Sequence, residues 1–186
     1  TDELLLALAK ETGKEVPAIL EEERGQLVDL MLDSYQYFHD KKVAITGDPD
    51  IVIALTQFVI SLGMIPKYVI TGTPGTAFAT QINEMLANAG IEGSVVKAES
   101  DLFELHQLIK NETVDLLIGE THAKYIARAE DVPFIRFGFP ILDRYAKQYF
   151  PVVGYKGGIR LVESMCDAIL DRIDRDCAEE DFELVR

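Results

Sequence analysis

Five short apolar segments recur along the chain and predict buried β-strands. Apolar residues occupy both odd and even positions within them, as expected for parallel strands that helices cover on both faces. Most of the segments end in glycine, which is a common turn residue. The segments are KVAITG (42–47), KYVITG (67–72), SVVKA (94–98), VDLLIG (114–119) and PFIRFG (133–138).

Helical patterns fill the intervals between these segments. Pro49 is a favourable first helical residue, and the apolar run after it ends at Gly63, a typical residue just past a helix. Further helical stretches follow at 76–90, after the possible caps Ser100 and Asp101, and at 158–174. This alternation predicts an α/β protein with a Rossmann-like, doubly wound, mostly parallel five-stranded sheet, flanking helices and an N-terminal helical extension.

The chain divides into three expected parts. Residues 1–38 form a helical lead-in, broken near Thr12–Pro17, that packs on the domain or on missing parts of a longer parent chain. Residues 39–175 form the Rossmann-like domain, and residues 176–186 form an acidic C-terminal tail laid over a surface. The lead-in carries a row of leucines that predicts a surface made to be covered: Leu4, Leu5, Leu6 and Leu8.

Composition narrows the classes of partner and cofactor. The net charge of −14 argues against nucleic acid, whose phosphates repel an acidic surface. No apolar run is long enough for a membrane span, and the N-terminus has no basic signal-peptide region. Two cysteines in a chain of this length indicate a reduced, cytoplasmic protein. Two cysteines and three histidines, as arranged here, cannot supply the usual four-cysteine ligation of an iron–sulfur cluster. Any such cluster must be held by other polypeptide.

The turns after the predicted strands show little catalytic chemistry. GDPD (47–50) is not a dinucleotide-binding turn, and TGTPGT (71–76) lacks the lysine and hydroxyl residue of a phosphate-binding P-loop. Glu120 and His122 could form a general acid–base pair, although a capped turn with a solvent-facing histidine is the better interpretation. His39 and His106 have no neighbouring cysteine or histidine in the sequence, and we assign them no role.

Asp29 and Asp33 are the strongest candidate site residues. They are four apart in RGQLVDLMLDSY (24–35), so on a helix both carboxylates lie on one face. Such a pair can hold one hard cation, but calcium takes about six to eight oxygen ligands, so others must come from elsewhere. From the residues alone, a solvated polar stripe on an amphipathic helix is the better interpretation.

Several longer motifs carry a family resemblance. ERGQLVDLMLDSY, FHDKKVAITGDPDIVIALTQFVISLGMIP and VPFIRFGFPILDR followed by GYKGG appear here in order. Together they resemble the C-terminal part of the β chain of nitrogenase component 1, the molybdenum–iron protein. The closing DFELVR resembles the natural end of that family, whereas the start does not, so an excised C-terminal domain is expected.

The resemblance implies where the redox centres of the parent lie. In the family, the β chain shares an eight-iron P-cluster (8Fe–7S) with the α chain through cysteines of its N-terminal part. The iron–molybdenum cofactor, or its vanadium or iron-only counterpart, belongs to the α chain. Cys166 and Cys177 match no cluster ligand. The resemblance therefore assigns no catalytic or cofactor-binding residue to this chain.

The resemblance also reverses the interpretation of Asp29 and Asp33. The family binds a calcium or iron ion between the two β chains of an α2β2 assembly, and this aspartate pair matches its ligands in spacing and flanking residues. The remaining ligands come from the N-terminal region of the partner β chain. We therefore expect Asp29 and Asp33 to be metal ligands.

The expected function is structural. The parent complex reduces dinitrogen to ammonia with electrons from an ATP-driven reductase, the iron protein. This chain frames contacts with the α chain and the second β chain. The alternatives are a subunit of the scaffold on which the nitrogenase cofactor is assembled, and a free-standing α/β protein that binds a nucleotide or sugar.

Overall fold

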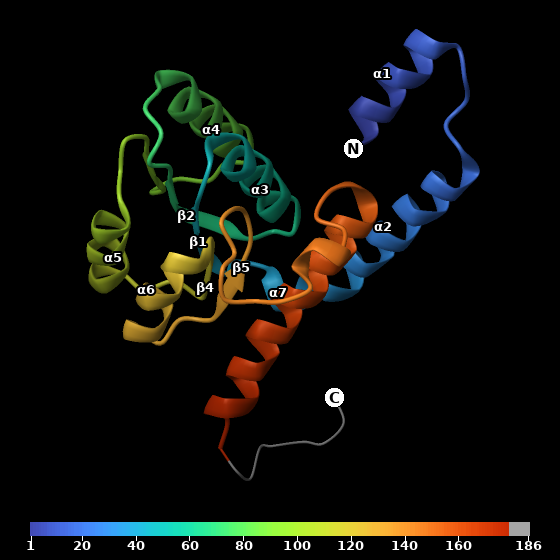
Figure 1. Ribbon diagram of the computed structural model, residues 1–186. Coiled ribbons are helices and arrows are strands. Elements are labelled where there is room, and N and C mark those ends of the chain that lie inside the picture. Colours follow the sequence, from blue (N-terminus) through green and yellow to red (C-terminus); the bar gives the residue numbers. More distant parts are fainter. Residues whose placement is uncertain (179–186) are drawn as a thin grey trace.

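The five apolar segments form one sheet in which every strand pairing is parallel (Figure 1). The computed structural model describes residues 1–178. The strand order is β3-β2-β1-β4-β5, so β1 lies at the centre of the sheet. The predicted α/β fold is confirmed. The strands are β1 (Lys42–Thr46), β2 (Ile65–Ile70), β3 (Val95–Lys97), β4 (Leu116–Gly119) and β5 (Phe134–Arg136).

Helices cover both faces of the sheet, which explains why the strands are apolar on both parities (Figure 1). Val43 and Ile45 of β1 face one buried cluster, and Ala44 between them faces the other. The first face is covered by α3 (Pro49–Ser61), α4 (Thr76–Asn88) and α7 (Gly154–Asp176). The second face is covered by α5 (Leu102–Asn111) and α6 (Lys124–Ala129).

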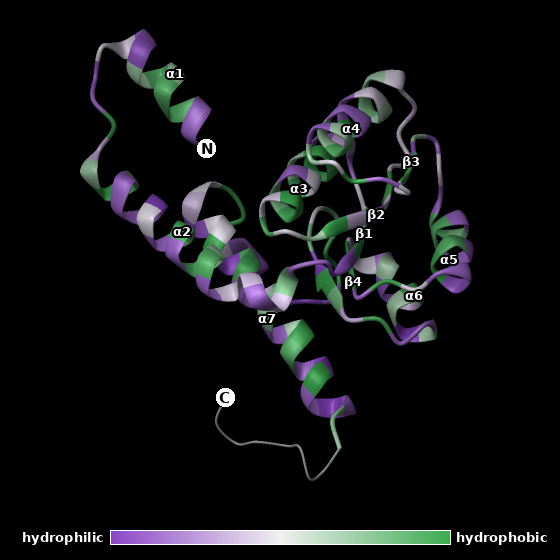
Figure 2. Ribbon diagram, turned by 180° about the vertical axis from the view of Figure 1, so that it is seen from behind, coloured by the Kyte–Doolittle hydropathy of each residue, from purple (hydrophilic) through white to green (hydrophobic). Residues whose placement is uncertain are grey.

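The N-terminal region consists of two helices, α1 (Asp2–Thr12) and α2 (Ala18–Phe38). The break between them falls where the sequence predicted it. Phe38 at the end of α2 is 0% exposed and belongs to the core of the first face, so this end of α2 is part of the domain's packing. By contrast, α1 has no buried residue and stands apart from the sheet (Figure 2).

The boundary at residue 38 and the separate tail stay predictions. Within the tail, Asp176 is still helical as the last residue of α7, and residues 179–186 lie outside the described part. Within residues 1–178, none of the helices is both long and apolar enough to cross a bilayer.

Two predicted helix starts follow from local chemistry. Pro49 opens α3, where its missing N–H costs nothing, and the Asp101 side chain caps α5 by accepting from the Glu104 amide. The sequence did not predict α6 or the earlier start of α7 at Gly154. α6 is only a short helix, and the first turns of α7 contain glycines that disfavour helix on their own. Tyr155 and Gly157 are nevertheless buried, and this burial overrides that preference.

Candidate functional site

Asp29 and Asp33 lie on the outer face of α2. The core-facing side of this helix carries Leu27, Met31 and Phe38, with Ser34 buried among them. A helix makes one turn in about 3.6 residues, so Asp29 and Asp33 fall on the side turned away from the core. Both are exposed. Carboxylates at this spacing are neighbours one turn apart, so the pair presents two oxygen donors to whatever approaches this face.

The spacing of this pair is not unique in the chain. Asp167 and Asp171 on α7 are also four apart and also exposed. No group of three or more His, Cys, Asp or Glu side chains within residues 1–178 is placed to hold one metal ion. Each aspartate pair is therefore at most part of a coordination sphere. The flanking sequence, not the spacing, distinguishes Asp29 and Asp33.

The two cysteines do not fit a shared iron–sulfur cluster. Cys166 is half-buried on α7 and packs against the core, and burial is the main reason why the pKa of its thiol is raised. Cys177 caps the end of the same helix, where its thiol donates to the Asp174 carbonyl oxygen. Their spacing of eleven residues corresponds to about 16 Å along the axis of α7. Metal ligation needs thiolates brought together, and this arrangement does not provide them.

The carboxyl ends of β1 and β4, the place where open parallel sheets bind ligands, make close contacts with other parts of the chain. A Cβ on Gly119 would lie 2.7 Å from Thr46 Cγ2, so the two strand ends are in close contact. The segment after β5 folds over them, because the Thr121 amide donates to the Pro140 carbonyl oxygen and the Leu142 amide donates to Thr121 Oγ1. These hydrogen bonds fasten the segment after β5 to the turn after β4 at this switch point.

Glu120 and His122 form the capped turn that the sequence favoured. The Glu120 carboxylate accepts from the His122 amide at 2.8 Å and lies 2.7 Å from His122 Nδ1. The His122 side chain is 53% exposed, so it faces solvent and not an enclosed reaction site. The other two histidines also have structural partners: His39 stacks on Tyr35, and His106 lies 2.6 Å from a Glu130 carboxylate oxygen.

Asp143 is the centre of a charge network that the sequence analysis did not identify. Arg136 donates to both of its carboxylate oxygens at 2.9–3.1 Å, and Lys124 and Thr121 donate at 3.2 Å. The hydrogen bonds from Arg136, followed by the one from Lys124, hold the pKa of Asp143 well below its ordinary value. The network fastens the segment after β5 onto the ends of β4 and β5. Only the family motif GFPILDR drew attention to this residue in the sequence.

Asp143→Asn is expected to lower the melting temperature at pH 7 by about 2–5 °C, because it leaves Arg136 and Lys124 without their carboxylate. The carboxylate has a depressed pKa in the folded protein, so its contribution is complete above its unfolded pKa of about 4. The difference between the two proteins should therefore persist from pH 7 to about pH 4 and shrink below that. Calorimetry across this range, with exposed Asp167→Asn as the control, measures it; equal melting temperatures at pH 7 would refute the role of the network.

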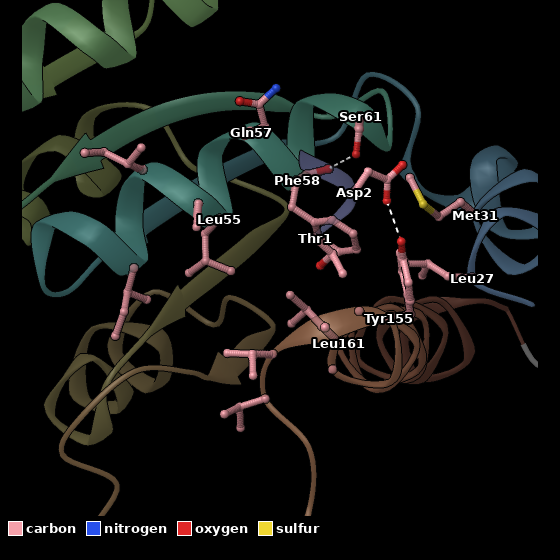
Figure 3. A pocket seen from close by; sticks show the side chains of 18 of the residues that line it. Thr1, Asp2, Leu27, Met31, Leu55, Gln57, Phe58, Ser61, Tyr155 and Leu161 are labelled. Atoms are coloured by element: carbon pink, nitrogen blue, oxygen red, sulfur yellow. Dashed lines mark hydrogen bonds between the residues drawn. The ribbon is translucent and has the colours of Figure 1, made fainter. Parts of the chain in front are cut away.

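A cavity of about 870 Å³ lies between α2, α3 and the start of α7 (Figure 3). Its walls are largely apolar and include Leu27, Leu55, Phe58 and Leu161, whose side chains point into it in Figure 3. The N-terminus closes one end, where the Tyr155 hydroxyl donates to Asp2 at 2.7 Å and Arg24 donates to the same carboxylate at 2.9 Å. Polar groups in the lining include Asp50, Gln57 and Ser61, while the Asp2 carboxylate is already engaged by Tyr155 and Arg24.

Comparison with known proteins adds the family context. The family model "Nitrogenase component 1 type Oxidoreductase" matches residues 1–170. The nitrogenase molybdenum-iron protein beta chain of Clostridium pasteurianum is 64% identical over 186 residues, which is 100% of this chain and 41% of that protein. The corresponding beta chain of Frankia alni is 46% identical over 187 residues, covering 100% of this chain and 35% of its own length.

Solved structures agree. The structure of nitrogenase Cp1 at pH 6.5 superposes with a TM-score of 0.98 at 64% identity, covering 100% of this chain and 41% of that one. A chain of nitrogenase Cp1 at pH 5 superposes with a TM-score of 0.60 at 10% identity over 87% of this chain, which shows a shared fold alone. The chain therefore spans less than half the length of the relatives it matches.

Proposed function

Because the chain belongs to the nitrogenase component 1 type oxidoreductases, we propose that it serves as the C-terminal part of a nitrogenase β chain. The family membership confirms the resemblance that the sequence motifs indicated. The observation that carries the proposal is the 64% identity to a molybdenum-iron protein beta chain along all 186 residues. Since the relatives named above are molybdenum-iron protein beta chains, the molybdenum type is the parent that they favour.

In this proposal the chain supports catalysis without performing it. The parent complex reduces dinitrogen to ammonia in the cytoplasm, using electrons from the ATP-driven iron-protein reductase. We propose that other polypeptide ligates the P-cluster and the iron–molybdenum cofactor, because Cys166 and Cys177 match no cluster ligand of the family. This chain frames contacts with the α chain and with the second β chain of an α2β2 assembly.

A test of this role compares the isolated chain with the parent complex. The isolated chain, incubated with the reductase and ATP, should reduce no acetylene and contain no iron after purification. The complex purified through a tag on the same chain should contain an α chain and reduce acetylene. Acetylene reduction by an iron-free sample of the isolated chain would overturn the proposal.

We also propose that Asp29 and Asp33 donate ligands to a calcium or iron ion between two β chains. The support is their exposure on the outer face of α2 and the match of their flanking residues to the family motif. A bound cation would offset the repulsion of about 0.2–0.5 kcal/mol between like charges at this spacing. The remaining ligands come from the partner β chain.

Asp29→Asn with Asp33→Asn should lower the affinity of the parent complex for the interface ion at least tenfold. The ion should then be lost from the complex. Metal analysis of the complex after exhaustive dialysis measures the loss. The matched control is Asp167→Asn with Asp171→Asn, which alters the equivalent pair on α7 and should leave the metal content unchanged. The isolated chain, which has only two of the ligands, should bind calcium more weakly than about 1 mM in calorimetry. Tight stoichiometric binding by the isolated chain would contradict the shared site.

A further inference from the structure

The cavity of about 870 Å³ between α2, α3 and the start of α7 is open to solvent and has a largely apolar lining (Figure 3). Val28, Val152 and Val153 belong to this lining and are 40%, 59% and 80% exposed. Single exposed apolar side chains are ordinary, whereas a group of them around one hollow marks a binding surface. The cavity therefore favours an occupant with apolar side chains.

The N-terminal helix of this chain does not fill the cavity. Thr1, Asp2 and Glu3 line one end of it, where Figure 3 draws Thr1 and Asp2 among the other lining side chains. The rest of α1 leads away: none of its residues is buried, and Leu4 and Leu6 are 63% and 65% exposed. Polypeptide that precedes Thr1 in a longer chain therefore starts at the cavity.

A clasp of two hydrogen bonds holds this end of the chain in place. The Tyr155 hydroxyl donates to the Asp2 carboxylate at 2.7 Å, and Arg24 donates to the same group at 2.9 Å. These bonds, that from Arg24 first, lower the pKa of Asp2, so the carboxylate stays ionised at neutral pH. Because Arg24 lies on α2 and Tyr155 on α7, the clasp ties the start of α1 to two walls of the cavity.

The proposed function supplies the polypeptide that precedes Thr1. The chain covers 41% of the Clostridium pasteurianum beta chain, and its closing DFELVR resembles the natural end of the family. As the C-terminal part of a β chain, it follows more than half of its parent. The segment directly before Thr1 is then attached at the rim of an unfilled apolar cavity.

We propose that this cavity is the seat of the parent's own polypeptide directly upstream of Thr1, whose apolar side chains fill it against Leu27, Phe58 and Leu161. The inference rests on the proposed function and deepens it, because it names the surface through which this domain is joined to the rest of the β chain. The Asp2 clasp fixes where the segment enters. An attached segment acts at an effective concentration of about millimolar, so modest contacts are enough to keep it bound.

Two other occupants fit the geometry less well. A separate polypeptide would lose translational and rotational freedom on binding and would compete with a segment already attached at the rim. A polar small molecule needs free hydrogen-bonding groups, but the Ser61 hydroxyl already donates to the Phe58 carbonyl oxygen at 2.6 Å and Asp2 is held in the clasp. Both occupants are outcomes that the experiments below distinguish.

Photo-cross-linking in the full-length parent chain identifies the occupant. Phe58→p-benzoylphenylalanine places the probe in the cavity, and Phe103→p-benzoylphenylalanine, at a position 71% exposed on α5, is the matched control. Mass spectrometry should link position 58, but not position 103, to a peptide upstream of Thr1, in a product that keeps the mass of one β chain on a denaturing gel. Linkage to another chain, linkage confined to the residues from Thr1 onward, or no linkage overturns the proposal.

The proposed function is checked separately in the same preparation. Co-purification of an α chain with the unaltered parent bears on that function, whereas the cross-link of the parent chain is read whether or not an α chain is present. A parent that lacks an α chain but gives the expected link would therefore contradict the proposed function and leave the seat of the upstream segment standing.

A charge placed in the cavity provides the energetic test. Ala54 lines the cavity and is exposed in this chain, so Ala54→Glu harms only packing with a further occupant. In the full-length parent it should speed thermolysin cleavage of the segment upstream of Thr1 at least about fivefold, because the released segment exposes the apolar side chains beside which this protease cuts. Ala87→Glu, at an exposed alanine on α4 outside the cavity, is the control and should leave the rate unchanged. Equal rates for the two variants would overturn the proposal.

Discussion

Phe38→Ala is expected to lower the free energy of unfolding of the isolated chain by about 3–5 kcal/mol, the range for truncating a buried aromatic side chain. Phe38 is 0% exposed and lies in the core between the sheet and the helices α2, α3 and α7. Its removal leaves a cavity, and it also loosens the attachment of α2 to the domain. Urea denaturation followed by circular dichroism measures the change.

The control for Phe38→Ala is Leu32→Ala on the same helix. Leu32 is 70% exposed, so its truncation should change the free energy of unfolding by less than about 0.5 kcal/mol. A small loss with Phe38→Ala would mean that α2 is a detachable lead-in and not part of the core. The experiment therefore also tests where the domain begins, a boundary that the sequence alone placed at residue 38.

The fold could be predicted because its strands are buried on both faces. Continuous apolar segments such as KVAITG have one stable environment in a soluble protein, a sheet between two layers of helices. Helix starts such as Pro49 depend on contacts within a single turn, and these are local in sequence. The first turns of α7 depend on contacts with residues distant in the chain, such as Leu27 beside Gly158, which no local pattern reports.

The candidate site residues also differ in how far the sequence could predict them. Asp29 and Asp33 could be placed on one helix face from their spacing, but α7 carries a second pair with the same spacing. Neither pair makes a complete metal site, so the choice between them depended on the family resemblance. The Asp143 network could not be predicted, because its donors come from β5, from the turn after β4 and from α6. Only the fold brings these segments together.

The sequence also could not predict that position 157 requires glycine. The requirement comes from the close approach of another part of the backbone. A Cβ at this position would lie 2.6 Å from the carbonyl carbon of Val152 and 3.0 Å from its oxygen. The Gly157 amide also donates to the Val153 carbonyl oxygen at 3.2 Å. Val152 and Val153 form the end of the loop between β5 and α7. Gly157 therefore sets how closely that loop can lie against α7.

Gly157→Val should lower the free energy of unfolding by about 3 kcal/mol, the upper end of the usual range for overpacking, because the obstructing atoms are backbone and cannot rotate away. For a chain of this size the loss corresponds to a melting temperature about 6–12 °C lower. Gly25→Val on α2 is the matched control: it is a helical glycine with nothing within 4 Å of the added Cβ, and should unfold like the unaltered chain. Differential scanning calorimetry compares the two variants. The strain must be relieved by moving Val152. An unchanged melting temperature would show that the segment before α7 has no fixed position against this helix.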